Sequence, residues 1–367
     1  MNIQLPKYNS LPIDKFAAIF NKTTNSYKYF WLLAIMNNIS EIENKKLHFS
    51  DLVFEIISLI WYPINFYQIS FGKQDKLYEK VLLLRNVLDI PVNVSRNNLL
   101  NLIKFNKNNA TIISIVNDII RYVPYRFLTP WFEDKLLGLS DSQKNNSIIL
   151  YSNNDLSAKT IYKIDITNKN IEITDDWFEY LINNMSIIKD FAYWNLLQYL
   201  EKRNPNIPNI SQKLFEPISR NLKTAKDFWN NVLNETVDLR CIYSNEIIQP
   251  NNFVIDHYIP WSFVTHDQLW NLIPTSVNVN SKKSNKLPAL KYLDKFAEVQ
   301  YIATRVVLSK HPARNSFIDD YLLLFHKNIE EFRLLSLNDF KKTLKETISP
   351  LGQIASNSGF STNWIYS

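Results

Sequence analysis

One short segment, residues 241–288, constrains the fold and chemistry of this chain more than any other. Within it an apolar run, Phe-Val-Ile at residues 253–255, leads directly into Asp256 and His257. Such a run predicts a short strand that delivers the two polar side chains at its end. The polar stretch further along predicts a helix that returns Asn280 to the same place. The segment therefore predicts a hairpin-and-helix unit that gathers a carboxylate, an imidazole and a carboxamide.

These residue types suit the metal-assisted hydrolysis of a phosphodiester. A hard divalent cation prefers oxygen ligands, and Asp256 and Asn280 supply them. The attacking water needs a base, and a histidine such as His257 ordinarily titrates near neutral pH. An isolated Asp-His pair is more often a surface pair without chemistry. Here several residue types fall at consistent offsets, which favours the catalytic interpretation.

The same segment resembles the HNH endonucleases, a nuclease class with a ββα-metal fold. Asp256 and His257 match the first element of that motif, Asn271 matches its central asparagine, and Asn280 matches its last position. The Asp-His-x-x-Pro run, the Lys-Ser flank and the Cys-x-Tyr-Ser opening are most similar to the HNH domain of the large RNA-guided CRISPR nuclease. The resemblance covers about an eighth of the chain.

This resemblance implies a role for each matching residue. His257 would be the general base that deprotonates the attacking water. Asp256 and Asn280 would hold one Mg²⁺ or Mn²⁺ ion, which would polarise the scissile phosphate and stabilise the leaving 3′ oxygen. Asn271 would brace the loop that carries the histidine. The implied substrate is DNA, and the implied products carry 5′-phosphate and 3′-hydroxyl ends.

Three lysines follow the last motif position, namely Lys282, Lys283 and Lys286. They are candidate phosphate clamps on either side of the broken bond. The alternative, a solvated helix end with no ligand, stays open at this point.

Two further polar residues, His266 and Asp267, lie between the parts of the motif. A second metal site is one interpretation of such a pair. We prefer to interpret both as loop residues that cap or hydrogen-bond within the loop leading to Trp270. No catalytic role is predicted for either.

The cysteine count excludes one subclass of this fold. Many HNH domains are stapled by a structural zinc held by two Cys-x-x-Cys pairs. This chain has a single cysteine, Cys241, so no such zinc is expected. We expect Cys241 to be a small buried residue on the first strand of the unit. Helices flanking the unit must then supply the missing support.

Composition agrees with a nucleic-acid partner without deciding for it. The chain has 367 residues and a formal net charge of +6, with a pI near 9.0, which suits a polyanionic ligand. A general bias toward Lys and Asn explains much of the same charge. Only four glycines occur and none builds a phosphate-cradling loop, so ATP use is not expected.

The chain offers no clear membrane or export signal. Residues 1–10 are polar and contain no apolar run. The most apolar stretch, residues 52–67, contains Glu55 and Pro63, which makes it a poor membrane span and a good buried helix. With one thiol, a disulfide-built extracellular protein is not expected. We therefore expect a cytoplasmic protein without membrane contact.

Apolar periodicity predicts helices through most of the chain. In the first part they are expected at residues 27–36, from 52 to near Pro63, and at 76–88, 99–105 and 112–120. Three β-like runs, at 148–151, 160–164 and 171–174, predict a small antiparallel sheet. Later helices are expected at 225–233, at 289–308 with an end at His311-Pro312, and at 316–325 and 338–348.

The chain is thus expected to be an α+β protein with two regions. Residues 1–235 would form a mainly helical region with a small β insert around 148–174, for target recognition or partner binding. Residues 236–367 would form the ββα-metal HNH unit, with its core at 239–288, flanked by helices. The expected activity is cleavage of DNA in restriction or anti-phage defence, with a partner protein or a homodimer left open. A homing or mobile-element endonuclease and a catalytically inactive nucleic-acid-binding protein are the alternatives.

Overall fold

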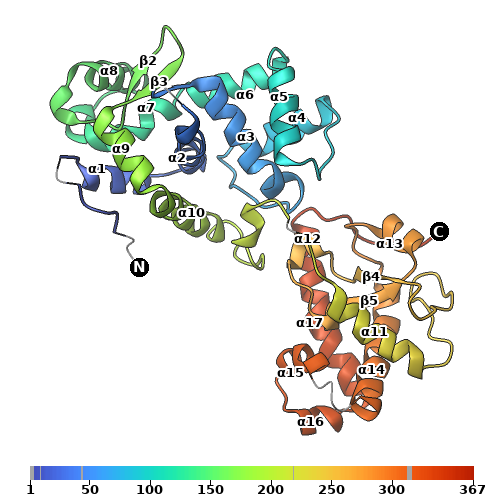
Figure 1. Ribbon diagram of the computed structural model, residues 1–367. Coiled ribbons are helices and arrows are strands. Elements are labelled where there is room, and N and C mark those ends of the chain that lie inside the picture. Colours follow the sequence, from blue (N-terminus) through green and yellow to red (C-terminus); the bar gives the residue numbers. More distant parts are fainter. Residues whose placement is uncertain (1–3, 9, 43, 218, 312–315) are drawn as a thin grey trace. The chain divides into compact units, whose positions relative to one another are not determined.

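The computed structural model describes residues 4–8, 10–42, 44–217, 219–311 and 316–367. The chain packs as two units, Met1–Pro205 with Lys213–Glu216 and Asn206–Gln212 with Pro217–Ser367. Figure 1 draws the first in blue to green and the second in yellow to red. The fold is α+β and mainly helical, as the sequence predicts.

The N-terminal unit is built around helix α2 (Tyr27–Asn38), which packs against α3 (Phe49–Asn65) and α10 (Met185–Glu201). Residues 29–36 of α2 are all buried, because neighbours cover every face of this helix. The other helices of the unit are α1 (Ile13–Ala17), α4 (Leu77–Val87), α5 (Arg96–Phe105), α6 (Ala110–Ile120), α7 (Val123–Phe127), α8 (Asp141–Asn154) and α9 (Asp175–Asn183).

Helix α3 is the apolar stretch that the sequence predicts as a buried helix. It begins at Phe49 and continues through Pro63 to Asn65, so it ends two residues beyond the proline near which the end was expected. Burial of nearly the whole helix compensates for the one backbone hydrogen bond that a proline removes. Within the described residues, no helix combines the length and apolarity that a bilayer crossing requires. The predicted helices at 27–36, 76–88, 99–105 and 112–120 correspond to α2, α4, α5 and α6.

A three-stranded antiparallel sheet completes this unit. Its order is β1 (Lys46–His48), β3 (Asn170–Ile173) and β2 (Tyr162–Asp165). The two predicted strands at 160–164 and 171–174 correspond approximately to β2 and β3. The predicted strand at 148–151 is wrong, because this run lies inside α8. A capping box formed by Ser140 and Gln143 starts that helix, and a short apolar run has no period that would distinguish strand from helix.

The C-terminal unit contains a two-stranded antiparallel ribbon followed by a helix. Strand β4 (Val254–His257) pairs with β5 (Leu272–Thr275), so that Asp256 lies opposite Ile273 and His257 opposite Leu272. Helix α13 (Val277–Lys283) follows and packs on β4. Helix α11 (Lys223–Glu235) packs on both strands, so this unit begins earlier in the chain than residue 236.

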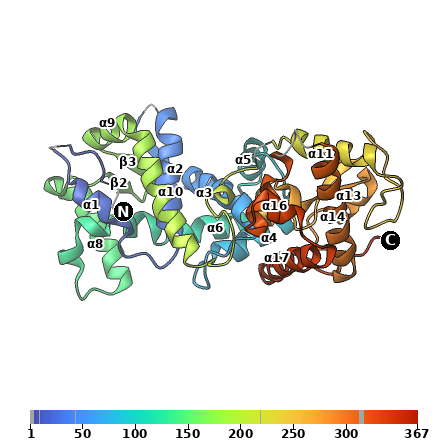
Figure 2. The same ribbon diagram turned by 90° about the horizontal axis from the view of Figure 1, so that it is seen from below.

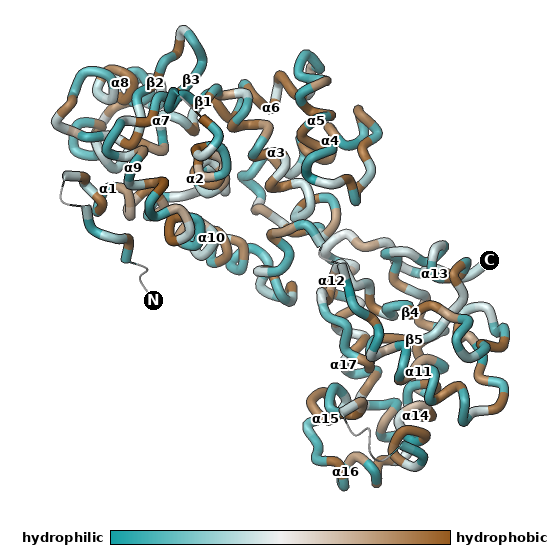
Figure 3. The backbone as a smooth tube through the Cα atoms, viewed as in Figure 1, coloured by the Kyte–Doolittle hydropathy of each residue, from teal (hydrophilic) through white to brown (hydrophobic). Residues whose placement is uncertain are grey.

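Two long helices, α14 (Leu293–Lys310) and α17 (Leu337–Asn357), pack against each other beside this ribbon (Figures 1 and 2). Along α17, hydrophobic residues recur between hydrophilic ones, as expected for a helix with one buried face (Figure 3). The predicted helix at 289–308 starts later, at Leu293. It ends at Lys310 with His311 as its C-cap, in agreement with the expected end at His311-Pro312, of which Pro312 itself lies outside the described residues. The helices predicted at 316–325 and 338–348 correspond to α15 (Asp319–Phe325) and to the longer α17. Two short helices, α12 (Trp261–Val264) and α16 (Ile329–Arg333), complete the unit.

Buried hydrogen bonds from these helices support the segment that leads into β5. The Gln300 side chain on α14 donates to the Leu272 carbonyl at 2.7 Å and accepts from the Tyr321 hydroxyl at 2.5 Å. The backbone N–H of Leu269 donates to an Asp320 carboxylate oxygen at 2.9 Å. Side chains of α14 and α15 thus hold the backbone on both sides of residues 270–271.

The single cysteine is free and buried, as expected. Its Sγ lies 3.2 Å from the Thr275 hydroxyl oxygen. It does not lie on a strand, which corrects the sequence-based expectation. The residues before and after it form only an isolated bridge between Arg240 and Ile247, and Cys241 begins the turn between them.

Gln300→Ala tests the helical support. We expect the free energy of unfolding to fall by about 2–4 kcal/mol, because the Tyr321 hydroxyl and the Leu272 carbonyl lose a buried partner. Urea denaturation of the full chain measures the loss. Gln353→Ala, which removes the same side chain from the exposed face of α17, should cost less than about 0.5 kcal/mol. Equal effects of the two substitutions would contradict the assigned role.

Candidate active site

The Asp-His pair lies on the last two residues of β4, at the end of the ribbon. Asp256 is 2% exposed. Lys283 of α13 reaches it, with Nζ 3.0 Å from Oδ1, and Lys283 is itself fully buried. The Tyr243 hydroxyl donates to the other oxygen, Oδ2, at 2.8 Å. Burial, and then the Asp256 charge, raise the pKa of Tyr243 well above its usual value, so this hydroxyl keeps its proton.

The ammonium group of Lys283 has a second acceptor on the same strand. It donates to the backbone carbonyl of His257 at 2.6 Å. One buried cation therefore neutralises Asp256 and fixes the backbone of the neighbouring histidine. Each carboxylate oxygen offers two acceptor positions, so Asp256 retains capacity for another ligand.

Asn271 lies immediately before β5 and binds the backbone that follows His257. Its Nδ2 donates to the Ile259 carbonyl at 2.9 Å, and its Oδ1 accepts from the Ile259 N–H at 2.9 Å. Its own backbone carbonyl accepts from the N–H of Tyr258 at 2.9 Å. All three bonds are made to the two residues that follow His257. Asn271 thus holds the segment that leaves the histidine.

Asn280 lies on α13, three residues before Lys283, and therefore on the same face of the helix. The Lys283 contact with Asp256 directs that face toward β4. The Asn280 side chain is half-buried and makes no hydrogen bond within the described part of the chain. An amide oxygen without a partner on this face is a suitable ligand for a hard cation.

A residue between the motif parts contacts the imidazole. Asp267 Oδ1 lies 2.7 Å from Nε2 of His257. Sequence analysis assigned Asp267 no role, because nine residues that include α12 separate it from His257 and no local pattern links the two. His266, in contrast, stays within its loop as expected, where its Nδ1 accepts from the N–H of Gln268 at 3.4 Å.

The hydrogen-bond network assigns the tautomer of His257. A carboxylate accepts, so Nε2 carries the proton and Nδ1 carries the lone pair. Burial lowers the pKa of His257 below its usual value of 6.5, and the hydrogen bond that Nε2 donates to Asp267 only partly offsets this. The ring is therefore held neutral and oriented, as a general base requires.

The three candidate clamp lysines differ in their surroundings. Lys282 and Lys286 are exposed. The ammonium of Lys282 donates to the carbonyl of Ser367 at 2.8 Å and lies over the ring of Tyr366. Lys283 is buried against Asp256, so a phosphate clamp does not fit its position. Its side chain supports the site from inside.

The donor set fits a hard divalent ion. Asp256 and Asn280 contribute oxygen atoms, which Mg²⁺ and Mn²⁺ prefer. Among the residues that the structure describes, no cluster of three or more His, Cys, Asp or Glu side chains forms a metal site. Two protein ligands would leave most coordination positions to water and phosphate oxygens, which is the usual arrangement for Mg²⁺ at phosphoryl sites.

Removing the buried cation tests the Asp256–Lys283 pair. We expect Lys283→Met to lower the free energy of unfolding by about 3–5 kcal/mol, because a buried carboxylate loses its partner. The double variant Lys283→Met/Asp256→Asn removes both charges and should lose less than the single variant. Lys282→Met, on the exposed face of the same helix, should lose less than about 0.5 kcal/mol. Urea denaturation in EDTA gives all three values, and a double variant less stable than the single one would refute the pairing.

Comparison with known proteins identifies the segment that carries this geometry. Residues 241–289 match the family model of the HNH endonucleases. No curated protein and no solved structure matches the chain significantly. The matched range contains Asp256, His257, Asn271 and Asn280, and the family implies a nuclease acting on nucleic acid. Residues 241–289 therefore form a domain of the HNH endonuclease family.

Proposed function

We propose that this protein is a metal-dependent endonuclease that hydrolyses phosphodiester bonds in DNA. The observation that carries the proposal is the supported Asp256–His257 pair at the end of β4. There Asp267 orients a neutral imidazole and Lys283 pairs with the buried Asp256. Asn280 lies three residues before Lys283 on α13, and its carboxamide makes no hydrogen bond within the described residues. Each group has the chemistry that a different part of the reaction needs.

In the proposed reaction His257 is the general base. Asp267 holds the Nε2 proton, which leaves Nδ1 to take a proton from the attacking water. The oxygen of that water forms a new bond to phosphorus, and the bond from phosphorus to the 3′ oxygen breaks. The products are a 5′-phosphate and a 3′-hydroxyl. Bound between Asp256 and Asn280, an Mg²⁺ or Mn²⁺ ion would supply Lewis-acid stabilisation of the charge on the leaving oxygen.

Access to the base sets a condition on this reaction. The side chain of His257 is 7% exposed, and that of Asp267 is 30% exposed. Asp267 occupies the Nε2 edge of the ring through its hydrogen bond. The water and the scissile phosphate must therefore approach from the Nδ1 edge, or the loop that carries Asp267 must move aside.

The substrate and setting extend the same proposal. Lys282 and Lys286, both exposed on or beside α13, are proposed to contact phosphates near the cut. We propose duplex DNA as the substrate and restriction or anti-phage defence in the cytoplasm as the setting. A single HNH site cuts one strand at a time, so a double-strand break requires a homodimer or two successive events.

Plasmid nicking tests the catalytic assignment. The wild type should nick supercoiled DNA with Mg²⁺ or Mn²⁺ and lose this activity in EDTA. His257→Ala should lower the rate by about 10²–10⁴-fold, since the base is removed. His326→Ala, at an exposed position of the same unit, serves as the matched control and should leave the rate unchanged. Equal nicking by wild type and His257→Ala, or none with any metal, would exclude the enzyme and favour an inactive nucleic-acid-binding protein.

Asp267 variants test its positioning role. Asp267→Ala should lower the maximal cleavage rate by about 10–100-fold at unchanged DNA affinity, because the imidazole loses its orientation. Asp267→Asn keeps an oxygen acceptor for Nε2 and should recover part of that loss. Asp319→Ala, an exposed carboxylate of the same unit, is the control. Rates that fall equally for Ala and Asn, or that do not fall, would contradict the role.

A further inference from the structure

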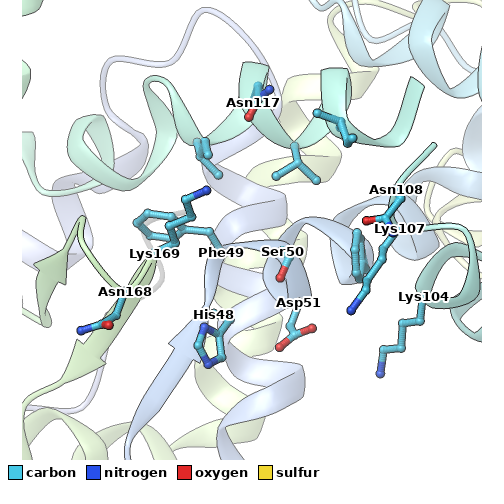
Figure 4. A pocket seen from close by; sticks show the side chains of 14 residues that line it. His48, Phe49, Ser50, Asp51, Lys104, Lys107, Asn108, Asn117, Asn168 and Lys169 are labelled. Carbon is cyan, nitrogen blue, oxygen red and sulfur yellow. The ribbon is translucent and has the colours of Figure 1, made fainter. Parts of the chain in front are cut away.

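A groove in the N-terminal unit gathers three segments that are far apart in the sequence. It encloses about 740 Å³. Residues 48–51 and Phe54, from the end of β1 into α3, line one part of it. The α5–α6 connection with the exposed face of α6 lines another, and the turn at 168–169 between β2 and β3 lines the third. Figure 4 shows the side chains that face this space.

The groove holds three exposed lysines, Lys104, Lys107 and Lys169. Within the described part of the chain, none of their ammonium groups has a hydrogen bond or an ion pair. Asp51 is the one carboxylate among the lining residues. The three lysines and Asp51 together leave a net charge of +2, from +3 and −1. The groove is therefore electropositive and its cations are free to bind a ligand.

The placement of these charges favours an extended ligand over a small one. Lys104 and Lys107 lie together on one side of the view and Lys169 lies on the other, with His48 and Asp51 of the β1–α3 junction between them (Figure 4). The three lysines come from different segments of the groove lining, so they offer separate contacts and not one shared anion site. A chain with a charge at every repeat can contact both sides.

Uncharged lining groups point to the same ligand class. The carboxamides of Asn108 and Asn117 face the groove and make no side-chain hydrogen bond within the described residues. Ile113 and Val116 of α6 add an apolar wall. Lysines and free carboxamides donate to phosphate oxygens, and carboxamides also reach base edges. A solvated lysine surface, in contrast, needs neither a hollow nor amide donors.

We propose that this groove binds the phosphodiester backbone of a polynucleotide. The inference deepens the proposed function, and it rests on that function only for the choice of a nucleic acid as ligand. It assigns a part of nucleic-acid binding to Lys104, Lys107 and Lys169 of the N-terminal unit. Asp51 opposes binding through its charge.

Binding in EDTA measures this property without cleavage. Fluorescence anisotropy of labelled duplex DNA, single-stranded DNA and RNA of equal length, titrated with the full chain, gives the affinity for each polynucleotide. The triple variant Lys104→Gln/Lys107→Gln/Lys169→Gln should bind its preferred polynucleotide about 10–100-fold more weakly near 0.1 M salt. Its slope of log K against log salt should be shallower by about two to three.

A matched variant separates the groove from net charge. Lys22, Lys45 and Lys135 belong to the same unit, and each pairs with an exposed or partly exposed carboxylate. Changing these three to Gln removes the same charge and should alter the affinity less than about twofold, since such surface pairs contribute little to folding. Asp51→Asn should change affinity in the opposite direction, about twofold to fivefold tighter at low salt. Circular dichroism and thermal unfolding check that all variants fold.

Each possible outcome decides the inference. Equal losses of affinity in the two triple variants would show that only net charge matters, which would overturn the inference. Absence of wild-type binding to all three polynucleotides would also overturn it and favour a protein ligand for the groove. Competition by millimolar inorganic phosphate as strong as that by unlabelled polynucleotide would assign the groove to a small anion instead. Wild-type binding without plasmid nicking would instead contradict the proposed nuclease, so the two failures are distinguishable.

Discussion

The buried ion pair between Asp256 and Lys283 is the interaction on which the rest of the candidate site depends. A carboxylate that is 2% exposed is costly to bury without a partner, and the Lys283 ammonium supplies one at 3.0 Å. The same ammonium binds the His257 carbonyl, so one side chain joins α13 to two consecutive residues of β4. Because Asn280 lies on the same face of α13, the pair also sets the direction of the second proposed metal ligand.

Two successive sets of hydrogen bonds support His257. Asp267 fixes its ring, and Asn271 holds the two residues that follow it. Behind Asn271, Asp320 and Gln300 hold the backbone on either side of it. These outer supports come from α14 and α15, helices outside the matched range of residues 241–289. The minimal HNH segment is therefore stabilised by the C-terminal helices of its own unit, which is consistent with the lack of zinc-binding cysteine pairs.

The structure agrees with the sequence where placement follows from a local pattern, since β4 ends at Asp256 and His257. The end of an apolar strand locates Asp256 and His257, and the family pattern locates Asn271 and Asn280. Sequence analysis fails where contacts depend on packing. The pairing of Asp267 with His257 crosses a loop, and nothing in the residues 258–266 between them signals it. Lys282 and Lys283 are adjacent lysines that the sequence does not distinguish. They lie on different faces of α13, so Lys283 is the buried partner of Asp256 and Lys282 is exposed. The strand prediction at 148–151 is wrong for a related reason. Four apolar residues fit a strand or a helix equally, and the capping box at Ser140 favours the helix.

The proposed metal site at Asp256 and Asn280 is tested most directly by diffraction from crystals soaked in Mn²⁺. With a non-hydrolysable DNA duplex bound, the anomalous signal should place one ion about 2 Å from an Asp256 oxygen and from Oδ1 of Asn280. Nδ1 of His257 should face the water nearest the scissile phosphorus. An ion bound elsewhere, or an Asn280 side chain turned away from Asp256 while DNA is bound, would contradict the account.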